Sequence, residues 1–121
     1  MKMLALLLTI LLVPFLLRAQ IVHIPDANFK AALVGNSGIN TNGDDEIQVS
    51  EAEAYDGGIY VYNRGIADMT GLEAFVNLTR LDCYSNHLTS LDVSANTALS
   101  TLLCYSNQLT SLDVSSNTAL T

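Results

Sequence analysis

Apolar residues recur along the C-terminal half of the chain at a spacing of 21 or 22 residues, far longer than the period of a helix or a strand. The strongest repeat relates residues 81–94 to residues 102–115. Its matching pairs are Leu81 and Leu102, Cys83 and Cys104, Asn86 and Asn107, Leu88 and Leu109, and Leu91 and Leu112, with Leu78, Leu99 and Leu120 continuing the period. A weaker copy lies at an offset of 22, at Ile59, Val61, Ile66 and Met69. The pattern indicates short stacked units, because one unit alone cannot bury its apolar side.

Each unit contains one predicted strand and two predicted bends. Residues 81–84 alternate between inward and outward positions, as a half-buried strand does, so successive strands should pair in parallel about 4.8 Å apart. Asn86 and Asn107 fall at the first bend, where we expect their amides to bond otherwise unpaired backbone groups. Asn96 and Asn117 recur at the second bend. A unit of 21 residues leaves no room for a full convex helix, so we expect turns or short 3₁₀ pieces over residues 92–98.

The pattern L-x-x-L-x-C-x-x-N-x-L-x-x-L is the leucine-rich-repeat signature with Cys in one leucine slot. Residues 71–79, the Leu-Thr-Ser-Leu-Asp-Val-Ser-x-Asn-Thr-Ala-Leu units and the opening residues 24–33 together resemble bacterial secreted leucine-rich-repeat proteins of the internalin-like type. The resemblance covers about residues 22–121. It implies an α/β right-handed solenoid with a parallel sheet on the concave face, little convex helix and a small helical N-terminal cap. It also implies a surface or secreted location, a protein-binding or adhesive role, and no enzyme chemistry.

Residues 1–19 are predicted to be a signal peptide. Lys2 gives a positive start, and residues 3–17 are apolar except for Thr9. This run is shorter than the ~20 residues that a membrane-spanning helix needs, which favours a signal peptide over a membrane anchor. We expect cleavage after Ala19, although Leu17 is not the small residue usual two positions earlier. The chain is therefore expected to be exported, with no membrane insertion after cleavage.

Residues 20–58 are predicted to form the cap. Asp26 can cap a helix over residues 27–34 whose apolar face includes Phe29 and Leu33, and Gly35 should end it. A second short helix is expected over residues 51–55, capped by Ser50.

An acidic loop within this segment has the twelve-residue spacing of an EF-hand calcium loop. Calcium requires six to eight hard oxygen ligands around one point. The predicted ligands, at loop positions 1, 3, 5, 7 and 12, are Asn40, Asn42, Asp44, Glu46 and Glu51. Two departures weaken the match, since position 1 is not Asp, and position 6 is Asp45 in place of Gly, which should strain the turn. The alternative is an acidic turn that holds no ion.

Charge and motif content exclude several classes of function. Only Lys30, Arg64 and Arg80 oppose twelve acidic residues after residue 19, so the mature net charge is −9, and nucleic-acid binding is not expected. The sequence holds no Ser/His/Asp set, no Cys-x-x-Cys motif and no glycine-rich phosphate loop, so we do not expect an enzyme. Cys83 and Cys104 occupy inward positions, which favours free thiols over a disulfide.

The outward strand positions carry the candidate binding surface. Tyr62, Tyr84 and Tyr105 align at offsets of 22 and 21 and should form a ladder on the concave face, beside a row that includes Asp82 and Leu103. Tyrosine offers a large contact area at low entropic cost, which favours a protein or glycan ligand. The alternative is that the rings only stabilise the sheet, in a structural spacer or calcium-stabilised surface scaffold without a specific ligand. We assign residues 59–121 to two and a half to three coils and expect further repeats beyond them.

Overall fold

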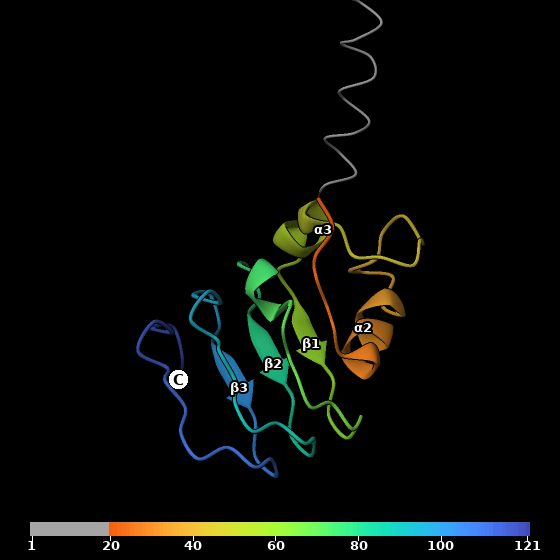
Figure 1. Cartoon of the computed structure of the whole chain (residues 1–121). Coiled ribbons are helices and arrows are strands. Elements are labelled where there is room, and N and C mark those ends of the chain that lie inside the picture. The colour runs from red at the N-terminus through yellow and green to blue at the C-terminus, as the bar shows by residue number, and fades with distance from the viewer. Residues whose placement is uncertain (1–19) are drawn as a thin grey trace, which may run out of the picture.

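The computed structural model describes residues 20–121, and the predicted signal peptide lies outside the described residues. The elements are α2 (Ala27–Val34), α3 (Val49–Ala54), β1 (Gly58–Tyr60), the 3₁₀ helix η1 (Leu72–Ala74), β2 (Arg80–Asp82) and β3 (Thr101–Leu103). Three strands lie side by side in an open sheet, and both helices lie at its β1 end (Figure 1). No helix in residues 20–121 has the length and apolar character needed to cross a membrane.

The sheet is parallel, and its register follows the sequence repeat. Ile59 pairs with Leu81, and Leu81 pairs with Leu102, which confirms the predicted offsets of 22 and 21. Stacking in this register places equivalent apolar side chains next to one another. The connections between strands are turns, apart from the single 3₁₀ turn η1, as the short repeat predicted.

The core runs through the stacked coils and into the N-terminal helices. Leu78, Leu81, Cys83, Leu88 and Leu99 are fully buried, as predicted. The equivalent residues of the last coil are only partly buried, because no further coil covers them within the described residues; these are Leu102, Cys104 and Leu109.

Two positions differ from the predicted core. Leu91 is only half-buried, whereas Val93, two residues later, is completely buried. The bend at residues 92–96 causes this difference, because the Asp92 carboxylate accepts the Ser94 N–H and the chain turns Val93 inward. Leu112, predicted to be in the core, is 38% exposed in the last coil.

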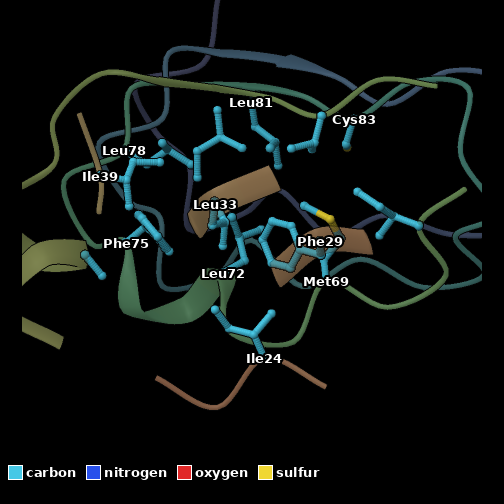
Figure 2. Packing of buried hydrophobic residues seen from close by; sticks show 14 of the residues in the cluster. Ile24, Phe29, Leu33, Ile39, Met69, Leu72, Phe75, Leu78, Leu81 and Cys83 are labelled. Atoms are coloured by element: carbon cyan, nitrogen blue, oxygen red, sulfur yellow. The ribbon is translucent and has the colours of Figure 1, made fainter. Parts of the chain in front are cut away.

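Helix α2 forms over the predicted residues and joins the core. The Asp26 carboxylate caps it by accepting the N–H groups of Asn28 and Phe29, both at 3.0 Å. Phe29 and Leu33 are buried and pack among leucines of the repeat (Figure 2). The helix ends at Gly35, which keeps a right-handed conformation.

Helix α3 begins earlier than predicted, and its cap is Gln48 in place of Ser50. The reason is a reciprocal capping box, in which the Gln48 N–H donates to Glu51 Oε1 at 2.9 Å. An antiparallel bridge between Ile21 and Gln48 also fixes the chain at this point. Ser50 therefore lies inside the helix and is exposed.

Candidate functional site

The three predicted tyrosines form a continuous stack beside the sheet. The ring centroids of Tyr62 and Tyr84 are 4.8 Å apart, and those of Tyr84 and Tyr105 are 4.6 Å apart, with interplanar angles of 0° and 5°. This spacing matches the separation of neighbouring strands, so the coil register itself sets it. Tyr62 and Tyr105 are 46% and 59% exposed, and Tyr84 is half-buried because both of its faces are covered.

A repeated turn holds the stack in place. The residue after each tyrosine has a left-handed backbone, with φ values of 54° at Asn63, 57° at Ser85 and 55° at Ser106. Backbone hydrogen bonds link these turns across coils: Asn63 N–H donates to the Tyr84 carbonyl and Ser85 N–H to the Tyr105 carbonyl. Non-glycine residues rarely adopt this conformation, and its recurrence shows that the surrounding bonds impose it. The tyrosines are therefore presented on a constrained backbone.

The Tyr84 hydroxyl group remains protonated at neutral pH. Partial burial, reinforced by the neighbouring Tyr105 and Tyr62, raises the pKa of Tyr84 above its ordinary value. This hydroxyl can therefore donate as well as accept a hydrogen bond. The stack presents ring edges and hydroxyl groups outward, while most ring faces are covered by neighbouring rings.

Asp82 differs from the prediction that it would offer an exposed polar contact. It is only 5% exposed, because Arg80 covers it in a bidentate pair, Nε to Oδ1 at 2.9 Å and Nη2 to Oδ2 at 3.2 Å. The Arg80 guanidinium also lies over the Tyr60 ring, 5.8 Å from its centroid, and its hydrogen bond to Asp82 raises its pKa. Arg80 is thus the charged group at this surface. The two-residue spacing on one strand face is the signal that could have identified it.

Leu103, the last predicted residue of this surface, is half-buried on the edge strand β3. It lines an open apolar hollow at the end of the sheet together with Leu102, Cys104, Tyr105 and Leu109. The structure thus places Leu103 beside Tyr105, at the far end of the tyrosine stack.

The acidic loop of residues 40–51 closes on itself through hydrogen bonds. Glu51 Oε2 accepts the Thr41 N–H at 2.7 Å and the Asn42 N–H at 3.2 Å, while its Oε1 accepts the Gln48 N–H. Asp44 accepts the Glu46 N–H at 3.0 Å, and this bond, more than any other contact, lowers the pKa of Asp44. The carboxylates predicted to ligate calcium therefore already have donors within the loop.

The geometry of the loop also departs from the EF-hand pattern. The left-handed residue is Gly43, with φ of 71°, and Asp45 has no positive φ, so the predicted strain at Asp45 was wrong. Glu46 forms an ion pair with Lys30 at 2.9 Å. Asn40 donates to the carbonyls of Val34 and Asp44, and its buried Oδ1 has no hydrogen-bond partner. Within residues 20–121, no three His, Cys, Asp or Glu side chains converge as a metal site would require. Calcium binding stays a prediction.

The two cysteines lie at equivalent positions of adjacent coils, and both are free thiols. Burial raises the pKa of Cys83 to about 12, and burial also raises the pKa of Cys104. Thiols with such raised pKa values are poor nucleophiles. Cys83 therefore serves as a core residue, and Cys104 lies half-buried in the last coil.

Comparisons with known proteins find similarity to internalins of Listeria monocytogenes. No protein-family model matches the chain. Internalin J from Listeria monocytogenes is 53% identical over 36 residues, which are 30% of this chain and 4% of that protein. The solved functional domain of InlJ from Listeria monocytogenes, described as including a cysteine ladder, is 40% identical with a TM-score of 0.68, over 80% of this chain and 21% of that one.

A second solved structure agrees in fold. The internalin inlF from Listeria monocytogenes has a TM-score of 0.70 over 80% of this chain and 28% of that one, and at 21% identity it supports the fold alone. This chain thus spans about a quarter or less of the relatives it matches. The repeat, the open parallel sheet and these similarities identify the chain as an internalin-like bacterial leucine-rich-repeat protein.

Proposed function

We propose that this chain is an exported binding or adhesion module whose concave sheet receives a protein ligand, and that it carries out no catalysis. The observation that supports the proposal most is the stack of Tyr62, Tyr84 and Tyr105, whose outer rings are about half exposed. Contiguous exposed aromatic surface is typical of interaction sites. Because the rings are already ordered by stacking, little side-chain entropy would be lost on binding.

The arrangement of the rings favours a protein over a glycan. A sugar ring packs best on an open aromatic face, but stacking covers both faces of Tyr84 and one face of each neighbour. What remains is ring edges and hydroxyl groups along the row, with one uncovered ring face at each end, and this combination suits the mixed apolar and hydrogen-bonding surface of a protein. Arg80 adds directional donors beside this row, since its pairing with Asp82 leaves further N–H groups for a partner carbonyl or carboxylate.

The proposal has two further parts in the N-terminal region. We propose that residues 1–19 direct export and that residues 20–58 cover the β1 side of the first coil. We also propose that the solenoid is right-handed. The burial of Phe29 and Leu33 against the repeat supports the covering role. A terminal unit of this kind is what a stacked fold needs at its end.

The test immobilises the wild-type chain and the Tyr84→Ser variant and compares the proteins that each captures from the surface of the source organism and from its surroundings. Val76→Ser is the matched control, since Val76 is 41% exposed and lies outside the sheet and the stack. Equal folded fractions are set by circular dichroism before capture. We expect Tyr84→Ser to lose its partner and Val76→Ser to retain it.

A structural spacer is the second candidate, and the covering of both ring faces of Tyr84 by its neighbours favours it. In that case Tyr84→Ser lowers the midpoint of thermal unfolding but leaves any captured partner unchanged at equal folded fraction. Equal recovery of partners by the wild-type chain and by Tyr84→Ser would therefore contradict the proposed concave site.

A further inference from the structure

The fold begins at the residue that follows the predicted cleavage point. The Gln20 carbonyl accepts the Val49 N–H at 2.8 Å, and Ile21 forms an antiparallel bridge with Gln48. Two residues along, the Val22 N–H donates to the Ile47 carbonyl at 2.9 Å. Figure 1 shows this first segment, in red, running past α3. Removal of residues 1–19 would therefore leave a chain whose first residue is held at its carbonyl side.

We propose that the mature protein carries pyroglutamate at position 20. The proposal rests on the proposed export and on cleavage after Ala19, which exposes the α-amine of Gln20. An α-amino group has a pKa of about 8, so part of it is neutral and nucleophilic near neutral pH. Its nitrogen lies within the same residue as the side-chain carboxamide, and such proximity strongly favours intramolecular attack.

The reaction balances without a co-reactant. The α-nitrogen attacks Cδ of the Gln20 carboxamide, and the new C–N bond closes a γ-lactam. The bond from Cδ to Nε2 breaks, and ammonia leaves with the proton given up by the amine. The product has lost the positive charge of the α-ammonium group and has no free amine for an aminopeptidase to recognise.

The structure leaves the reacting groups free. Gln20 is exposed, and among residues 20–121 no hydrogen bond engages its backbone N–H or its carboxamide, while its carbonyl is bound to α3. Gln20 lines a hollow together with Gln48, Val49, Ser50 and Glu53. The hydrogen bonds that anchor residues 20–22 survive the reaction, since none of them uses the α-nitrogen.

The test uses the full-length chain, expressed with its own residues 1–19 in a bacterium that exports it. Intact mass spectrometry of the exported protein should give residues 20–121 less the mass of one ammonia. Stepwise N-terminal sequencing should be blocked until the protein is treated with pyroglutamyl peptidase. The matched control is Gln20→Asn, whose shorter side chain would have to close a strained smaller ring; it should keep a free, sequenceable amine.

Each alternative outcome overturns a defined step. A free α-amine on Gln20 after export contradicts cyclisation but leaves the proposed export intact. A first residue other than residue 20 contradicts the cleavage point on which the lactam depends. Retention of residues 1–19 on the exported protein, or failure of export, contradicts the proposed leader and the lactam together.

Discussion

Asparagine side chains provide the connections between coils. Asn86 is 3% exposed, and its Oδ1 accepts the N–H groups of Arg64 and Ile66, both at 3.0 Å. Its Nδ2 donates to the carbonyls of Val61 and Cys83 at 2.8 and 3.0 Å. One amide thus satisfies polar groups of two coils that would otherwise be buried without partners. Asn107 repeats part of this pattern one coil later, confirming the predicted role of both residues.

Replacing Asn86 by Ala should reduce the free energy of unfolding by about 1–3 kcal/mol, because buried backbone groups lose their partners. Asn107→Ala should cost less, since Asn107 lies in the partly exposed last coil and its Oδ1 accepts a single N–H group. Urea unfolding followed by circular dichroism measures both values. Equal losses of unfolding free energy for the two variants, or no loss for Asn86→Ala, would contradict the proposed difference between an asparagine in the central coil and one in the last coil.

Asp26 connects helix α2 to the first coil and makes the fold sensitive to acid. One carboxylate oxygen caps α2, and the other accepts the N–H groups of Ala67 and Asp68 at 2.9 and 3.2 Å. Burial alone would raise the pKa of Asp26, but these backbone hydrogen bonds outweigh it and lower the pKa. The lowered folded-state pKa stabilises the fold above the unfolded pKa of about 3.9, and this contribution is lost as the pH falls through the folded value.

We therefore expect the midpoint of thermal unfolding to fall as the pH is lowered from about 5 through about 3. Asp26→Asn should be less stable than wild type at neutral pH, and the difference should shrink in acid, where the wild-type carboxylate is also protonated. Asp45→Asn is the control, because Asp45 is exposed and makes no hydrogen bond in the part of the chain described. A constant difference across the pH range would contradict the role assigned to the ionised carboxylate.

At the scale of elements, the period of the sequence predicted the sheet register and the Asn contacts, since like residues must stack on like. The period did not predict which side chain covers an outward-facing residue of a strand. Asp82 is buried because the long Arg80 side chain folds over it, and the two-residue spacing places the two side chains on one face without fixing the rotamer that pairs them. The start of α3 was misplaced for a similar reason, since the Gln48–Glu51 capping box outcompetes Ser50. Local side-chain hydrogen bonds decided both details.

The acidic loop is the element in which spacing and geometry disagree. Its residues keep the order of a calcium loop, but Glu51 already accepts three N–H groups, so an ion would have to replace these donors. If calcium does bind, we expect only weak affinity, at millimolar concentrations typical of extracellular modules. Calorimetry with calcium on the wild-type chain and on Glu51→Gln measures this. Absence of heat in both proteins would leave the loop as a hydrogen-bonded turn.

Across the whole molecule, each coil contacts only its neighbours, so stability should depend on position along the stack. The coil containing Leu81 and Leu88 has a neighbour on both sides, and both leucines are fully buried. The coil containing Leu102 and Leu109 has a neighbour on one side among the described residues, and its apolar residues are only partly buried. Local opening therefore should begin in the last coil.

The two cysteines can measure this difference in stability between coils, because they occupy the same position in adjacent coils. Cys104 is half-buried, so brief opening of the last coil should expose it, whereas Cys83 should become accessible only when the central coil unfolds. Burial raises the pKa of both thiols, so exposure has to precede the formation of a reactive thiolate.

A thiol reagent under native conditions should therefore label Cys104 much faster than Cys83, and a low concentration of denaturant should accelerate the labelling of Cys104 first. The single variants Cys83→Ser and Cys104→Ser assign each rate by mass spectrometry. Equal rates would indicate one cooperative unit, and no labelling before reduction would indicate that the two thiols form a disulfide.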